Sequence, residues 1–225
     1  IKHISKGRIL DLAGGTGDNS NFIQEYNDYS IDLVDISKQM LKQCQNSSIN
    51  KVCKGMLEFL TVQESCCYDA IVCTWALMYE QPQKVLNQCQ RLLKNGGYLY
   101  ILVNDQQTLP QIRKIYPKLL IEYVGSINKL MFDLPMPNNA QQLERWAKKA
   151  GLKNCRVTSK KQEFYFTDWN RAAKFVTSTG ALAGYDAMLD LKNEKIFNTL
   201  VEQLQKFFTK PCITHHFVMG IFKKG

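Results

Sequence analysis

Short apolar runs and amphipathic stretches alternate along the first hundred residues of the chain. The apolar runs have the length of buried strands and lie at residues 8–13, 30–35, 50–55, 68–74 and 98–103. Apolar residues recur at helical spacing between these runs, at 18–26, after the capping residue Ser37 and at 81–94. Alternating strands and helices need crossover connections, so we expect a parallel sheet with helices on both faces.

The second half of the chain is less regular. We expect two long strands, at 156–166 and 213–223, and helices at 138–151, 169–177 and 193–208. A length of 225 residues fits a single domain. We expect a cofactor-binding half at 1–112 and an acceptor-binding half at 113–225, the latter with a helical cap insertion at about 167–211.

Charge changes this picture only in the second half. The formal net charge is +9; residues 1–112 hold 10 basic and 11 acidic side chains, and residues 113–225 hold 19 and 9. No Arg-rich run accompanies the excess, so nucleic acid is disfavoured as a partner. As a collective field, the excess favours an anionic acceptor.

Cysteine usage and hydropathy indicate the compartment. The eight cysteines include no C-x-x-C pair, so no metal site is predicted, and free thiols favour a reducing, cytoplasmic location. No apolar run approaches the roughly 18–20 residues that span a bilayer. The chain starts at Ile1 rather than Met, which leaves open a preceding segment that could carry a targeting signal.

The most informative segment is D-L-A-G-G-T-G at residues 11–17. A strand that enters a helix through small residues brings backbone N–H groups and a helix N-terminus close to a ligand. Asp35 ends the next strand, where a carboxylate can accept hydrogen bonds from ribose hydroxyls. Ser20 stands where a pyrophosphate-binding G-x-G-x-x-G loop has its third glycine. An adenosyl ligand without a pyrophosphate therefore fits better than a dinucleotide.

This segment resembles the D/E-x-G-x-G-x-G motif of the class I, Rossmann-like S-adenosylmethionine-dependent methyltransferases of the small-molecule type. Residues 31–41 resemble the second motif of that family, and residues 68–72 and 92–99 resemble its fourth- and fifth-strand motifs. The resemblance covers about residues 8–103. It implies a sheet of about seven strands, mostly parallel with an antiparallel last strand, and a helical insertion before that strand.

The resemblance also implies which residues bind S-adenosylmethionine and its product S-adenosylhomocysteine. Asp11 and the loop residues Ala13, Gly14, Gly15 and Gly17 are expected to hold the methionine moiety, and Asp35 the ribose. The adenine is expected near Ile36, Met40, Met56 and Leu57, and the sulfonium near Thr74 and Trp75. The sequence departs from the family pattern at Ala13, which replaces a glycine, and at Met56, which replaces an acid that accepts a hydrogen bond from the adenine amino group.

The segment at 73–79 (C-T-W-A-L-M-Y) bears on the methyl acceptor. It lacks the N/D-P-P-Y/F loop of nucleic-acid amino-methylases and resembles the S-x-x-x-L-H-W segment of small-molecule methyltransferases. Met78 and Tyr79 replace its His and Trp, which removes an obvious proton acceptor. Asp105 is the nearest acid after the fifth strand, and we expect it to be a solvated loop residue.

The insertion at 167–211 resembles, in its place along the chain, the caps of methyltransferases that act on carboxyl groups, including carrier-bound ones. A carboxylate is already a nucleophile at pH 7, so such an enzyme needs no general base, only an aligned and dry pocket. The candidate acceptor-binding residues are Arg171, Trp75, Tyr79, Tyr165 and Trp169.

Three hypotheses remain open. The first is methyl transfer to a small or acyl-carrier-bound acid. The second is methyl transfer to a neutral lipid-like or quinone-like acceptor, in keeping with 24 aromatic residues. The third is a catalytically silent, methyltransferase-like binding subunit, because Met56 and the absent His each remove an expected function.

Overall fold

The computed structural model describes residues 7–26, 28–128, 134–178, 182 and 185–225. The chain divides into two compact units. Unit 1 comprises Ile1–Asp105, Pro135–Ser159 and Phe217–Gly225, and unit 2 comprises Gln106–Leu134 and Lys160–His216. The division therefore interleaves segments of the second half of the chain with the first half.

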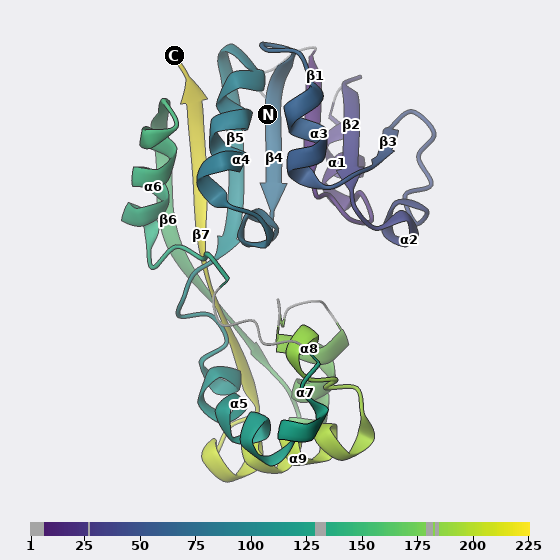
Figure 1. Ribbon diagram of the computed structural model, residues 1–225, viewed down its shortest axis with the longest axis vertical. Helices are drawn as coiled ribbons and strands as arrows, with labels where there is room; N and C mark the ends of the chain where they lie inside the picture. The colour runs from purple at the N-terminus through teal and green to yellow at the C-terminus, as the bar shows by residue number, and fades with distance from the viewer. Residues whose placement is uncertain (1–6, 27, 129–133, 179–181, 183–184) are drawn as a thin grey trace. The chain divides into compact units, whose positions relative to one another are not determined.

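A seven-stranded sheet forms the framework of unit 1, with the strand order β3-β2-β1-β4-β5-β7-β6 (Figure 1). The strands are β1 (Arg8–Leu12), β2 (Ser30–Asp35), β3 (Asn50–Cys53), β4 (Tyr68–Thr74), β5 (Leu93–Asn104), β6 (Leu152–Tyr165) and β7 (Cys212–Lys224). The neighbouring pairs from β3 to β5 are parallel, and β7 is antiparallel to β5. The expected fold class is confirmed: a mostly parallel, Rossmann-like sheet with an antiparallel last strand.

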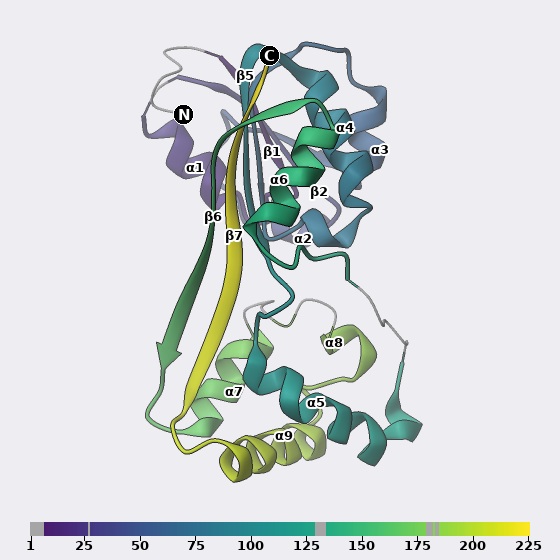
Figure 2. The same cartoon turned by 90° about the vertical axis from the view of Figure 1, so that its left-hand side faces the viewer.

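Helices lie on both faces of this sheet. Figure 2 shows α1 (Asp18–Gln24) on one face and α3 (Met56–Val62), α4 (Pro82–Leu92) and α6 (Ala140–Lys149) on the other. The short helix α2 (Lys38–Leu41) follows β2, and the Ser37 side chain caps it as the sequence predicts, accepting a hydrogen bond from Met40 N. Because both faces are covered, the central strands are mainly apolar, as in the buried run from Ala70 to Cys73 of β4.

Unit 2 is mainly helical. It contains α5 (Pro110–Glu122), α7 (Trp169–Ser178), α8 (Tyr185–Met188) and α9 (Glu194–Phe207), with a short 3-10 turn, η2 (Val124–Ser126), after α5. The parts of β6 and β7 nearest the helices also belong to it. Its core draws on the apolar faces of α5, α7 and α9 and includes Leu119, Ala173 and Leu200, which are fully buried. This unit has a hydrophobic core of its own.

Three helices were absent from the sequence-based expectation: α3, α5 and α8. Strand β5 also begins earlier than expected, at Leu93, where a helix was predicted to continue to residue 94. Gly96, expected to lie in a helix stop, has a φ of 79° inside this strand, next to an irregular register with β4. The other predicted helices and strands occur with ends displaced by a few residues.

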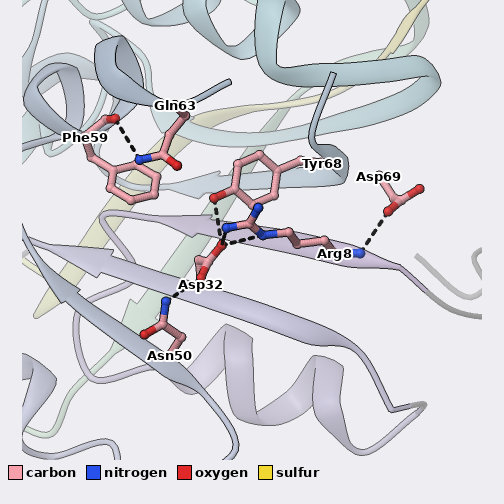
Figure 3. A network of polar contacts seen from close by, with 7 residues as sticks. All are labelled: Arg8, Asp32, Asn50, Phe59, Gln63, Tyr68 and Asp69. Atoms are coloured by element: carbon pink, nitrogen blue, oxygen red, sulfur yellow. Dashed lines mark hydrogen bonds and ion pairs between the residues drawn. The ribbon is translucent and has the colours of Figure 1, made fainter. Parts of the chain in front are cut away.

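A polar cluster ties four neighbouring strands together on the amino-terminal side of the sheet (Figure 3). The buried carboxylate of Asp32 on β2 accepts hydrogen bonds from Arg8 Nε at 2.9 Å, Asn50 Nδ2 at 2.6 Å and Tyr68 Oη at 2.7 Å. These partners begin β1, β3 and β4, respectively. Burial, followed by the hydrogen bond to Asp32, raises the pKa of Tyr68, so the phenol stays a donor. One carboxylate therefore fixes the relative positions of four strands.

Among the described residues, no helix combines the length and the apolar character needed to cross a bilayer.

Candidate active site

The glycine-rich loop joins β1 to α1 at the carboxyl edge of the sheet. Ala13, Gly15 and Gly17 have φ angles of 55°, 58° and 81°, a left-handed conformation in which a Cβ atom is strained. Gly14 N donates to Val34 O at 3.1 Å, and Gly17 N donates to Gly14 O at 2.9 Å. The sequence folds this way because three small residues tolerate the turn, although Ala13 does so with a side chain present.

Asp11 lies beneath this loop and is fully buried. Ser20 Oγ, on α1, donates to Asp11 Oδ2 at 2.7 Å, whereas Asp11 Oδ1 finds no hydrogen-bond partner in the described part of the chain. Burial raises the pKa of the Asp11 carboxyl to about 6, although the hydrogen bond from Ser20 opposes the shift. A buried carboxylate with an unpartnered oxygen is costly, so this site is suited to a cationic ligand group.

Gly14 packs directly against Asp11 and leaves no room for a side chain. A Cβ atom at position 14 would lie 2.5 Å from both Asp11 Cγ and Leu33 Cδ1, closer than real Cβ contacts. Any larger residue would therefore displace the carboxylate or the strand behind it. Position 14 therefore requires glycine for the loop to pack over Asp11.

Asp35 connects the loop to the end of β2. Its Oδ2 accepts a hydrogen bond from Gly15 N at 2.9 Å, and its Oδ1 accepts one from Ser37 N at 2.8 Å. Each oxygen of a carboxylate can accept two hydrogen bonds, so each keeps one further acceptor position. Asp35 is held in place from two sides and can still accept from a ligand.

The residues expected near an adenine differ in exposure. Ile36 is 78% exposed and Met40 is 39% exposed. The Met40 methyl group would lie 3.3 Å from a Cβ on Gly15, so its thioether borders the loop. Met56 is buried at the start of α3, and Leu57 after it is partly buried. Glu58 is the first acid after Met56 in the sequence. Its side chain accepts a hydrogen bond from Gly55 N at 3.3 Å and so caps α3.

The end of β4 lies next to this loop. Asn19 Nδ2 donates to Thr74 Oγ1 at 2.9 Å, which joins α1 to β4. Trp75 has a left-handed backbone, with a φ of 61°, and its indole is 41% exposed. Its ring packs edge-on against Phe217 of β7, with the centroids 5.5 Å apart. Tyr79, at the end of the 3-10 helix η1 (Leu77–Tyr79), is 53% exposed. Trp75 and Tyr79 therefore offer aromatic surface in unit 1.

These contacts link Asp11, the loop, Asp35, Met40 and Thr74 into one region of unit 1. Sequence reasoning missed Asn19 and Ser20 as contributors to this region. Ser20 had been noted only as a missing glycine, yet its position in the first turn of α1 directs its hydroxyl back to Asp11. A hydroxyl residue nine positions after a strand-end acid is the signal that could have identified the pair.

The remaining acceptor candidates belong to unit 2. Trp169 is 5% exposed and packs in the helical core, with its ring 6.0 Å from Phe208. Tyr165 is 67% exposed and donates from Oη to Glu163. The Arg171 side chain is 73% exposed, with its Nε 3.9 Å from Asp168 Oδ2. The roles of these three residues in acceptor binding stay predictions.

Asp105 differs from expectation. It was expected to be solvated, and this is wrong: Asp105 and the preceding Asn104 are each 3% exposed. Asn104 is the last residue of β5, beyond the last pair with β4 at Leu102, and Asp105 ends this segment of unit 1. Both residues have interaction partners, so this segment is fixed.

The chain is similar to known methyltransferases in sequence and in fold. Residues 10–101 match the family model described as a methyltransferase domain. The chain is 29% identical over 138 residues to the ubiquinone/menaquinone biosynthesis C-methyltransferase UbiE of Francisella tularensis subsp. novicida, covering 57% of this chain and 55% of the relative. It is 28% identical over 112 residues to the malonyl-[acyl-carrier protein] O-methyltransferase of Herminiimonas arsenicoxydans, covering 49% and 42%. The chain thus spans about half of each curated relative.

A solved structure extends the likeness over nearly the whole chain. Geranyl diphosphate C-methyltransferase from Streptomyces coelicolor A3(2), in complex with Mg2+, geranyl diphosphate and S-adenosyl-L-homocysteine, aligns with a TM-score of 0.56 at 12% identity. The alignment covers 98% of this chain and 73% of that one. At this identity the comparison establishes the fold.

Proposed function

We propose that the chain is a Rossmann-like, S-adenosylmethionine-dependent methyltransferase that transfers a methyl group to a small-molecule acceptor, because residues 10–101 match the model of a methyltransferase domain. The observation that carries the proposal is the unpartnered oxygen of the buried Asp11. The cofactor carries a positively charged α-ammonium group, which would pair with this negatively charged carboxylate.

Residues of unit 1 fit the cofactor's parts. Asp11 Oδ1 would accept from the ammonium group, because it is the buried acceptor with no protein donor. The remaining acceptor positions of Asp35 would take the ribose hydroxyls. Ile36 and Met40 expose apolar surface that an adenine ring would cover.

The chemistry that follows is positional. When bound, S-adenosylmethionine supplies a methyl carbon already activated by the adjacent sulfonium. The residues near the end of β4 would then orient the acceptor and exclude water. Trp75 is suited to that task because its ring is held by Phe217 and still exposes 41% of its surface.

For the acceptor, we favour a neutral, lipid-like or quinone-like molecule over an acid. The acid hypothesis needs a cation that grips a carboxylate, and Arg171 already lies near Asp168 with 73% of its side chain exposed. Trp169, the proposed aromatic wall, is part of the unit 2 core. A relative named as a quinone-pathway C-methyltransferase covers more of the chain than the relative named as a carrier-protein O-methyltransferase.

Calorimetry followed by an acceptor screen tests the proposal. We expect S-adenosylhomocysteine to bind wild-type protein, and labelled methyl groups to reach demethylated quinones and related aromatic lipids. No heat at millimolar ligand would refute cofactor binding. Binding without transfer to any acceptor would point instead to a silent subunit. Transfer to acids, with a raised KM in Arg171→Met, would restore the acid hypothesis.

A further inference from the structure

The outer surface of unit 2 presents large apolar side chains that the described residues leave uncovered. On α5 and η2, Ile121 is 79% exposed and Val124 is 71% exposed. The opposite face of α5, with Ile112, Ile115 and Leu119, is fully buried in the core. Packing within the unit therefore explains the buried face of α5 but not the exposed side chains of Ile121 and Val124.

Cations flank this apolar ridge. Successive exposed positions of α5 place Pro117 and Ile121 between Arg113 on one side and Lys114 and Lys118 on the other, following the helical period of 3.6. None of these three cations forms an ion pair within the described part of the chain, although Lys161 and Arg171 of the same unit do. Glu122 is the single acid on α5.

The carboxyl end of α9 extends the same surface. Lys118 Nζ lies 3.9 Å from the centre of the Phe207 ring, and Lys114 Nζ lies 5.4 Å from both Phe207 and Phe208. These distances place the ends of two lysine chains over partly buried aromatic rings. Lys206 and Lys210, also exposed, flank the same two rings in sequence. Figure 2 shows α5 and α9 side by side.

We propose that this α5–α9 surface (Arg113, Lys114, Lys118, Ile121, Val124, Lys206, Phe207, Phe208 and Lys210) docks unit 2 onto an anionic phospholipid bilayer. Interfacial protein segments combine apolar side chains that enter the headgroup region with lysines and arginines that reach the lipid phosphates. Lysine stems can lie along apolar surface while their charges stay in the polar layer. The mixture of uncompensated cations and exposed aliphatic residues matches this environment better than it matches water.

The proposed docking does not depend on methyl transfer, although a bilayer is also where a lipid-like acceptor would be found. It is tested by co-sedimentation of the protein with vesicles of phosphatidylcholine alone and of phosphatidylcholine with 30 mol% phosphatidylglycerol, a proportion of about one anionic lipid in three. We expect binding to the anionic vesicles that weakens as salt is raised, and little binding to the neutral ones.

Two double variants separate the contributions. Ile121→Ser/Val124→Ser and Lys114→Glu/Lys118→Glu should each lower the partition onto anionic vesicles about tenfold or more, since about 1 kcal/mol per lysine is lost in the second and apolar burial in the first. The changed side chains are exposed, so melting temperatures should stay close to wild type. Val62→Ser and Lys84→Glu, at exposed positions of unit 1, are the matched controls and should bind like wild type.

Absence of wild-type binding at low salt, or equal binding by the unit 2 variants, would overturn the proposal. A wild-type dimer in solution that becomes a monomer in Ile121→Ser/Val124→Ser would also overturn it, because the surface would then belong to a second copy of the chain.

Discussion

Asp11 is a buried side chain whose cost in stability fits its proposed role in cofactor binding. Its carboxylate is fully buried, with one hydrogen-bonded oxygen and one that finds no partner among the described residues. No cation of the described part of unit 1 pairs with it, and burial raises its pKa to about 6. The residue that best supports the cofactor proposal is therefore also a source of strain in the free protein.

Replacing Asp11 with Asn should separate the two effects. Asn keeps the size and a hydrogen-bonding oxygen but removes the buried charge, so we expect a higher melting temperature in the free protein at pH 7. Binding of S-adenosylhomocysteine should weaken by about tenfold to a hundredfold, because the ammonium group loses a charged acceptor. Differential scanning fluorimetry and calorimetry measure both. Ser126→Ala, in η2 of unit 2, is a control that should change neither.

The same group predicts how stability depends on pH. A pKa raised to about 6 in the folded state, against about 3.9 in an unfolded chain, means that protonated Asp11 favours folding. That contribution is complete below about pH 4 and is lost as the pH rises through about 6, amounting to about 3 kcal/mol. Urea unfolding at a series of pH values should show wild type losing stability relative to Asp11→Asn over this window. Parallel curves would show that Asp11 does not titrate there.

Ala13 carries backbone strain that a glycine would relieve. Its φ of 55° costs a residue with a Cβ about 1 kcal/mol, and its position corresponds to a glycine in the family motif. We expect Ala13→Gly to raise the free energy of unfolding by about 0.5 kcal/mol, the gain in strain being partly offset by the entropy of glycine in the unfolded chain. Denaturant titration measures the change. Gly14→Ala, where a Cβ would clash with Asp11, should instead destabilise the protein and weaken cofactor binding.

At the scale of elements, the strands follow from the sequence because each one is a short apolar run bounded by polar or small residues. The helices were harder to predict. Met56, Phe59 and Leu60 of α3 have helical spacing, but seven residues directly after a weak strand gave too short a pattern. In α5, Pro117 argues against a helix because it lacks an N–H and disfavours a helical residue before it. Tertiary packing of Ile112, Ile115 and Leu119 outweighs that cost.

The candidate site, like the secondary structure, was predictable only in part. The positions of the loop and Asp35 were predictable, since they lie at the end of a strand and the start of a helix, and their roles in cofactor binding stay predictions. The partner of Asp11 and the burial of Asp105 were not predictable, because both depend on which side chains the fold brings together. Composition alone also could not reveal that Trp169 lies in a core, since apolar spacing is equally consistent with a binding wall.

The hydrogen bonds to Asp32 should contribute to the stability of the sheet. Asp32→Ala would leave the Tyr68 hydroxyl without its acceptor in a fully buried position and would release Arg8 and Asn50. We expect a loss of about 3 kcal/mol in the free energy of unfolding. Lys54→Ala, which removes an exposed pair with Glu58 at 3.9 Å, should cost less than about 0.5 kcal/mol. Comparable losses in the two variants would show that the cluster contributes no more than a surface pair.

At the scale of the whole molecule, both units carry a net positive charge, although the excess of basic residues along the sequence lies in residues 113–225. Unit 1 holds 17 basic and 12 acidic residues, and unit 2 holds 12 and 8, so the net charges are +5 and +4. The positive excess of residues 113–225 is therefore shared, because residues 135–159 and 217–225 belong to unit 1. Total charge says little about where an anionic partner binds; the local arrangement on α5 and α9 says more.

We expect cofactor binding to change amide hydrogen exchange in unit 1 and to leave it unchanged in unit 2. We expect S-adenosylhomocysteine to slow amide hydrogen exchange in peptides that contain residues 11–20 and 35–41, because their backbone would border the ligand. Peptides from the core of α9 in unit 2 should exchange as in the free protein. Exchange mass spectrometry with and without ligand measures this. Protection of α9 alone, with residues 11–20 unchanged, would contradict the placement of the cofactor.

The left-handed Ala13 also has a consequence for how this protein can change over generations. Alanine and glycine codons differ only at their middle base, so a single nucleotide substitution separates this loop from its relaxed form. In a mutagenised library grown under heat stress, that substitution should arise early and by itself.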